Sequence, residues 1–165
     1  MDLGRIARHL LFGARRVRSA FPQETLAAIE SAIKASEAAH TGEIRFAVEG
    51  ALDGAPLFAG QSPRERAIDV FSALRIWDTE RNNGVLIYVL LADRDVEIVA
   101  DRGVAAVIAP AEWQSICNEI EAAFREGKFE QGSLAAVRAV TERLIRHFPA
   151  SGAEHNEMPD RVVLL

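Results

Sequence analysis

The pattern of apolar residues along the chain predicts four main helices. In each of them, apolar side chains recur three and four residues apart, as on one face of a helix. Pro22 and Pro63 stand where a first helical residue tolerates a missing N–H, and Pro149 stands where a helix must stop. The predicted helices cover residues 23–39, 63–76, 111–126 and 130–148.

Three other segments follow the two-residue period of β-strands or form a continuous apolar run. Residues 43–49 alternate between apolar and polar side chains, and residues 96–101 resemble a half-exposed strand. Residues 84–91, GVLIYVLL, predict a central strand that is covered on both faces. Helices that alternate with strands predict an α/β fold, a small mixed β-sheet sandwiched between α-helices.

Local signals refine the ends of these elements. Ser62 and Glu65 form the pattern of a capping box, and Gly42 is suited to a left-handed cap after the first helix. Leu57–Phe58 can add a short edge strand. Trp77 and Trp113 fall in the apolar stripes of their helices, so we expect both in the core.

The two strands at 84–91 and 96–101 predict a tight hairpin. If Asp93–Arg94 is a two-residue turn, counting outward from it sets the pairing of the strands. This register brings Asp101 and Arg102 beside the polar loop 78–83. The pairs it predicts are Ala92 with Asp95, Leu86 with Asp101, and Gly84 with Gly103.

Oxygen-bearing side chains gather at this edge of the predicted sheet. Carboxylate and amide oxygens are the ligands of hard cations, and Ca²⁺ tolerates an irregular arrangement better than Mg²⁺. The pattern lacks the regular spacing of a helix–loop–helix calcium loop, and a solvated polar turn is the alternative. Arg102 is either an anion clamp beside the metal or a salt-bridge partner of Asp101, Glu97 or the loop. The predicted metal ligands are Asp101, Asn83, Asp78, Glu80 and Asn82.

Other reactive side chains are predicted to be structural. Cys117 lies within an apolar helical stripe, which favours an inert core thiol. His40 and His147 stand in the last turns of helices, where an imidazole meets free carbonyl groups. The sequence contains none of the common nucleophile-elbow, phosphate-loop, zinc-protease or dinucleotide-binding motifs. No catalytic residue is therefore assigned.

The two ends of the chain differ from the domain between them. Residues 1–21 form a basic arm with the pattern of a short amphipathic helix, suited either to anionic lipid or to packing on the domain with a solvated arginine face. Residues 22–149 form the α/β domain, and the polar segment that begins the tail 150–165 is expected to be flexible. The tail ends in Val-Val-Leu-Leu, which can join a sheet edge, bind a partner or stay disordered.

Composition narrows the class of protein. The 165 residues carry a net charge of −5, which argues against general nucleic-acid binding. One cysteine in the sequence fits a reducing compartment. No signal peptide or transmembrane run is visible, so a cytoplasmic protein is expected, with peripheral membrane or protein contact through residues 1–20 or the tail. Oligomeric state does not follow from these features.

Several motifs together resemble the TPM domain family, named after a thylakoid lumen protein, a photosystem repair protein and a nematode acetylcholine-receptor modulator. The resemblance covers roughly residues 22–148 and is greatest for small bacterial members with an arginine-rich arm and no transmembrane anchor. The motifs are G-E-I-R-F at 42–46, a helix ending in Trp77, N-N-G before VLIYVLL at 82–91, D-R-x-V-E-I at 93–98, A-D-R-G at 100–103 and F-x-x-G-x-F-x-x-G at 124–132.

The resemblance implies a Rossmann-like α/β/α sandwich with a calcium site at one end of the sheet. Asn83–Gly84 matches the family's entry to the central strand, and Asp101 matches the polar end of the returning strand. Many relatives carry a glycine-rich run where this chain reads Gly-Val-Ala-Ala at 103–106. Some members are described as acid phosphatases and others as assembly or repair factors. Two hypotheses follow: a calcium-binding interaction or assembly module, or a metal-dependent phosphatase of phosphate monoesters.

Overall fold

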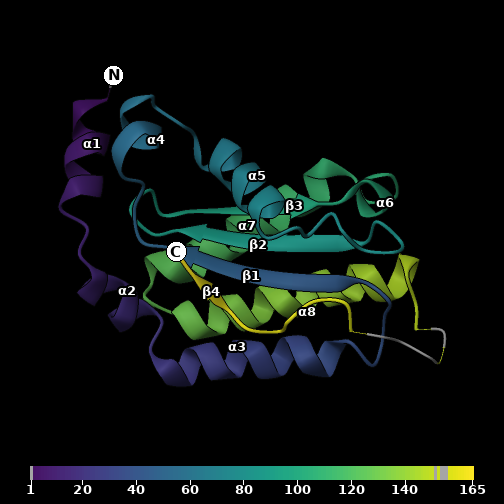
Figure 1. Cartoon of the computed structure of the whole chain (residues 1–165). Helices are drawn as coiled ribbons and strands as arrows, with labels where there is room; N and C mark the ends of the chain where they lie inside the picture. The colour runs from purple at the N-terminus through teal and green to yellow at the C-terminus, as the bar shows by residue number, and fades with distance from the viewer. Residues whose placement is uncertain (1, 151, 153–155) are drawn as a thin grey trace.

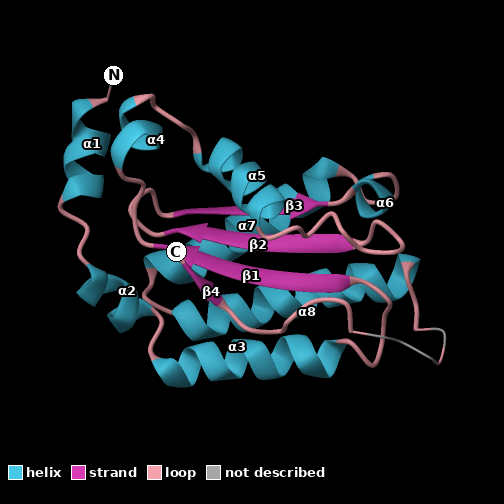
Figure 2. Ribbon diagram, in the orientation of Figure 1, coloured by secondary structure: helices cyan, strands magenta, loops and turns pink. Residues whose placement is uncertain are grey.

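A computed structural model describes residues 2–150, 152 and 156–165. Its centre is a four-stranded sheet in the order β3-β2-β1-β4 (Figures 1 and 2). β1 runs parallel to β2 and β4, and β2 runs antiparallel to β3. The strands are β1 Glu43–Glu49, β2 Gly84–Leu90, β3 Asp95–Ala100 and β4 Val163–Leu164.

Helices cover both faces of this sheet. On one face, Ile44, Phe46 and Val48 of β1 join a core with side chains of α3, α7 and α8. On the other face, Ala47 of β1 joins a second core with α4 and α5 (Figure 1). The helices are α1 Leu3–Leu10, α2 Ala14–Ala20, α3 Gln23–Ser36, α4 Gly54–Phe58, α5 Pro63–Ala73, α6 Arg102–Ala105, α7 Pro110–Arg125 and α8 Phe129–His147.

This arrangement confirms the predicted α/β sandwich with a mixed sheet. Every residue of β1 and β2 is buried, because helices cover both faces of these two inner strands. The capping box at the start of α5 is present, with the Ser62 hydroxyl accepting from the Glu65 amide. Apolar periodicity therefore located the main helices and strands correctly.

Several local expectations are wrong. Leu57–Phe58 belongs to the short helix α4 and not to an edge strand. Trp77 lies beyond the end of α5 and is 48% exposed, whereas Trp113 is buried as expected. Gly42 is not among the glycines with a positive φ; instead it packs closely against α8, where a Cβ would lie 2.8 Å from Leu144 Cδ2.

The hairpin register differs from the predicted one by two residues. Asp95 pairs with Leu90 instead of Ala92, and Asp101 lies opposite Gly84, where its N–H donates to the Gly84 carbonyl at 2.8 Å. The reason is that Leu91 and Ala92 donate to β1 and the residue after it, at Glu49 O and Gly50 O. A shift of two keeps each side chain on its predicted face.

Both ends of the chain return to the domain. The arm forms two helices, α1 and α2, and Val162–Leu165 runs beside β1, where Leu165 N donates to Val48 O at 3.0 Å. The apolar end of the tail thus joins the sheet edge of its own domain. Residues 151 and 153–155 of the predicted flexible segment lie outside the described residues.

Candidate functional site

The loop between α5 and β2 is held in a defined conformation by its own backbone. Asn82 adopts a left-handed conformation with φ +51°. The Asn82 N–H donates to Thr79 O at 3.3 Å, and the Asn83 N–H donates to the Thr79 hydroxyl at 3.1 Å. These bonds fix the direction in which Asn83 enters β2.

Asn83 is buried, and one of its side-chain atoms accepts no hydrogen bond. Its Nδ2 donates to Thr41 O at 2.6 Å, which identifies the other amide atom as the oxygen. The residue is 0% exposed, and Oδ1 has no hydrogen-bond donor among the described residues. Asn83 therefore presents a fixed, desolvated carbonyl oxygen.

Asp101 has a similar unpaired oxygen at the neighbouring end of β3. Its Oδ1 accepts from the Arg102 N–H at 2.7 Å and caps the short helix α6. Asp101 is 5% exposed, and no described group donates to its buried Oδ2. Because Asp101 lies opposite Gly84, both unpaired oxygens belong to the same end of the sheet.

Two backbone carbonyls of the loop also approach this end of the sheet. Gly103 N donates to Asn82 O at 2.9 Å. A Cβ added at Gly103 would lie 2.6 Å from Asn82 O and 2.8 Å from Arg81 O. Glycine at position 103 is therefore required for the loop carbonyls to pack against the start of α6.

The remaining predicted site residues lie around these two. Asn82 Oδ1 accepts from the exposed Arg102 at 3.1 Å, so Arg102 bridges to the loop rather than to Asp101 or Glu97. Asp78 and Glu80 are exposed, and within the described part of the chain neither carboxylate bonds to Asn83 or Asp101. The Glu80 N–H instead donates to Glu157 of the tail at 3.0 Å.

The donors at this end of the sheet are oxygen atoms. The structure places one carboxylate, one side-chain amide and two loop carbonyls at this end, and oxygen ligands of these kinds suit a hard cation. No three His, Cys, Asp or Glu side chains among the described residues gather where they could hold a metal ion. A cation here would thus depend on amide and carbonyl oxygens as much as on Asp101.

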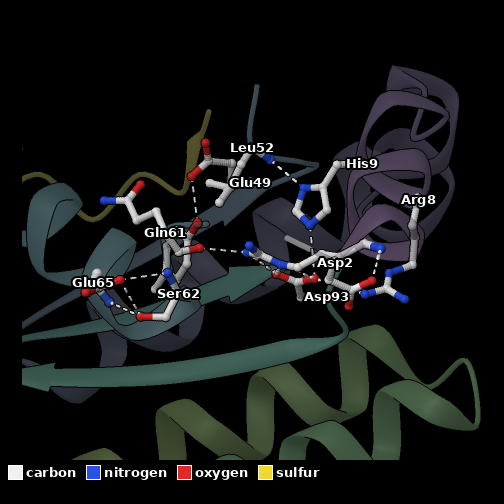
Figure 3. A network of polar contacts seen from close by, with 11 residues as sticks. Asp2, Arg8, His9, Glu49, Leu52, Gln61, Ser62, Glu65 and Asp93 are labelled. Carbon is white, nitrogen blue, oxygen red and sulfur yellow. Dashed lines mark hydrogen bonds and ion pairs between the residues drawn. The ribbon is translucent and has the colours of Figure 1, made fainter. Parts of the chain in front are cut away.

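A second polar network, which the sequence pattern did not reveal, joins α1 to the hairpin turn (Figure 3). The His9 Nδ1 accepts from the Leu52 N–H at 2.9 Å, so its Nε2 is the protonated nitrogen and donates to Asp93 at 3.0 Å. Arg5 donates to the same carboxylate at 2.7 Å. Because both imidazole nitrogens are occupied, His9 is not placed to act as a general base.

The other candidate side chains lie in the core or at helix ends. Cys117 is 3% exposed, and burial raises the pKa of its thiol to about 12. The predicted position of this thiol in the core is therefore confirmed, and a raised pKa disfavours the reactive thiolate. His40 is buried and forms an isolated β-bridge with Pro149, while His147 is exposed at the end of α8. Within the described part of the chain, no helix is long and apolar enough to cross a bilayer.

Comparison with known proteins identifies the family. A family model described as the TPM domain matches residues 18–143. The solution structure of the BA42 protein from Bizionia argentinensis is 30% identical, with a TM-score of 0.74 over 86% of this chain and 93% of that one. The N-terminal domain of a P. gingivalis protein shares the fold, with 18% identity and a TM-score of 0.60 over 81% and 82% of the two chains. No functionally curated protein matches the sequence.

Proposed function

The chain belongs to the TPM domain family, and from this premise we propose that it is a Ca²⁺-binding interaction or assembly module. The observation that carries the proposal is the pair of buried, unpaired oxygens at one end of the sheet, Asn83 Oδ1 and Asp101 Oδ2. They are the two residues that matched the family's motif at the ends of β2 and β3.

Unpaired buried acceptors are costly. Leaving one desolvated acceptor without a donor costs about 1–3 kcal/mol, and more when the group is charged. A bound cation would remove this cost for Asp101 and Asn83 together. The carbonyls of Arg81 and Asn82, packed against Gly103, would complete the ligand set with water.

The chemistry of the donors favours Ca²⁺ over Mg²⁺. Mg²⁺ demands a small octahedral shell and is held mainly through carboxylates and water, whereas Ca²⁺ accepts amide and backbone carbonyls in irregular arrays. Bound Ca²⁺ would supply positive charge and fix the loop. Asp101 would keep the start of α6 in place, and Asn83 would keep the loop tied to Thr41.

A calcium titration tests this proposal. We expect amide chemical shifts of residues 79–84 and 101–104 to move, and the melting temperature to rise. At Ca²⁺ concentrations 100-fold above Kd the gain in unfolding free energy is about 2.7 kcal/mol. Asp101→Asn should abolish both effects, while Asp53→Asn, which changes an exposed aspartate near α4, should keep them. If the shifts of these residues stay unchanged at millimolar Ca²⁺, in roughly tenfold excess over the protein, the site is excluded.

One observation favours a second candidate, a metal-dependent phosphatase. Arg102 is exposed beside the proposed ligands and can contact an anion without moving the backbone. Hydrolysis of an aryl phosphate, lost with chelator and in both Asp101→Asn and Arg102→Gln, would support catalysis. Calcium binding without such hydrolysis would support the interaction module alone.

A further inference from the structure

The helix α1 turns Arg5, His9 and the partly buried Ile6 toward the domain and its leucines outward. Arg5 Nη2 donates to Asp93 of the hairpin turn at 2.7 Å. His9 Nε2 donates to the same carboxylate at 3.0 Å (Figure 3). The outward side carries three leucines, Leu3, Leu10 and Leu11, which are 74%, 63% and 79% exposed. A surface helix of a globular domain ordinarily packs its apolar stripe against the core.

The ion pairs hold this orientation. Side chains of Arg5 and Asp93 are 16% and 9% exposed, and that of His9 is 0% exposed, so the network is largely desolvated. The Leu52 N–H, which donates to His9, attaches α1 to a second segment of the domain. Rolling α1 over to bury its leucines would leave the Asp93 carboxylate buried without its partners, which is strongly unfavourable.

The same arm, α1 and α2, also carries exposed arginines. Arg15, Arg16 and Arg18 of α2 are exposed and form no ion pair within the described residues; Arg16 lies over the Phe12 ring at 5.5 Å. Arg8 of α1 is also exposed and reaches Asp93 at 3.3 Å. The arm's only acid, Asp2, accepts from the backbone N–H of Arg5. The outer surface of the arm is therefore apolar and cationic.

We propose that the outer face of α1, with the arginines of α2, is a docking surface for an anionic lipid bilayer. The leucines would enter the boundary between headgroups and acyl chains, and the guanidinium groups would bind lipid phosphates. This inference is independent of the proposed calcium site. A second copy of the chain fits the surface less well, because a symmetric dimer would place the same cationic patches against each other.

Vesicle co-sedimentation of the full chain tests the leucines. We expect binding to vesicles of phosphatidylcholine with 30% phosphatidylglycerol, and at least tenfold weaker binding to phosphatidylcholine alone. The double variant Leu10→Ser/Leu11→Ser should raise the lipid concentration for half-binding at least tenfold. Both residues are exposed, so the fold should survive. Ile145→Ser/Val107→Ser, at two apolar sites that are 41% and 47% exposed outside the arm, is the matched control and should bind as the wild type does.

A second set of variants tests the charges. Arg15→Gln/Arg16→Gln/Arg18→Gln should lose the preference for anionic vesicles, while Arg138→Gln/Arg146→Gln/Arg161→Gln, at exposed arginines elsewhere, should keep it. Failure to bind anionic vesicles would overturn the proposal. Light scattering that shows a dimer, broken by the leucine variant, would also overturn it and assign the surface to self-association. Equal binding of the two arginine triples would remove the specific role of α2.

Discussion

At the scale of single residues, Asp95 is a carboxylate whose burial is only partly compensated, by the charge of Arg5. It begins β3, and its Oδ1 is buried without a donor among the described residues. Burial raises its pKa to about 6, and the charges of Glu97, Glu121 and Asp93 add to that increase. At neutral pH the folded protein therefore holds an ionised group that the unfolded chain would solvate better.

Replacing this carboxylate with an amide should stabilise the protein only where Asp95 is ionised. Because the folded pKa lies above the ordinary value of 3.8, the contribution of Asp95 to stability is complete below pH 3.8 and is lost as pH rises through 6. We expect Asp95→Asn to gain about 1–2 kcal/mol at pH 7.5, after allowance for solvent screening, and little at pH 4. Urea unfolding at both pH values measures this. An equal gain at both would show that charge is not the cause.

A second residue-scale prediction concerns Gly103. An added Cβ would collide with two backbone carbonyls, at 2.6 and 2.8 Å, and backbone atoms cannot move aside as a flexible side chain can. We expect Gly103→Ala to lose about 1–3 kcal/mol of unfolding free energy. Gly4→Ala is the control, since its nearest neighbour is the flexible Asp2 side chain at 3.3 Å and alanine favours helix α1. Thermal melting of both variants distinguishes local collision from a general effect of alanine.

At the scale of elements, burial explains which parts of the fold were predictable. β2 and the main helices follow from the pattern of apolar residues, because the burial of their apolar side chains in the core determines where each element lies. The hairpin register was not predictable, since Leu91 and Ala92 bond to the β1 side at Glu49 and Gly50 instead of continuing the hairpin. Asn83 and Asp101 were proposed as ligands from residue type, position and family resemblance, but which of their oxygens lacks a donor depends on Thr41 and Arg102.

The orientation of α1 on the domain could also not be predicted from the pattern of apolar residues. Apolar periodicity assigns the leucines to the inner face of α1, whereas Arg5 and His9 donate to Asp93 and take that face together with Ile6. The partners of Asp93 come from residues more than 80 positions away in the chain. The local sequence of α1 does not show that Asp93 is its partner. The three-dimensional structure is therefore needed to show which face of α1 is exposed.

The Asp93 network should decide whether the arm stays on the domain. Burial alone would raise the pKa of Asp93, but hydrogen bonds from Arg5 and His9 outweigh it and lower that pKa below 3.8. The stabilisation is thus complete above pH 3.8 and lost as pH falls through the lower folded value. We expect Asp93→Ala to cost about 2–3 kcal/mol and to speed tryptic cleavage at Arg15, Arg16 and Arg18 at neutral pH. Asp53→Ala, at an exposed site, should leave the cleavage rate unchanged.

At the scale of the whole molecule, the two proposed binding surfaces lie at opposite ends of the sheet (Figure 1). Asn83 precedes β2 at one end, and the hairpin turn that holds α1 follows β2 at the other. Seven residues of strand separate them, roughly 23 Å at the usual rise per residue. The ends also differ in charge: residues 2–18 carry five arginines, whereas Glu37, Glu43, Glu157 and Asp160 gather where the tail meets α3 and β1.

This separation predicts that calcium and lipid bind independently. Exposed charges more than about 10 Å apart are largely screened at physiological salt, and neither surface shares a side chain with the other. The calcium concentration for half-saturation should therefore change less than twofold when saturating anionic vesicles are added, measured by isothermal titration. By reciprocity, calcium should leave the lipid dependence of sedimentation equally unchanged. A coupling of tenfold or more would mean that the sheet transmits a change between its ends, and Asp101→Asn, which removes calcium binding alone, would then abolish that coupling.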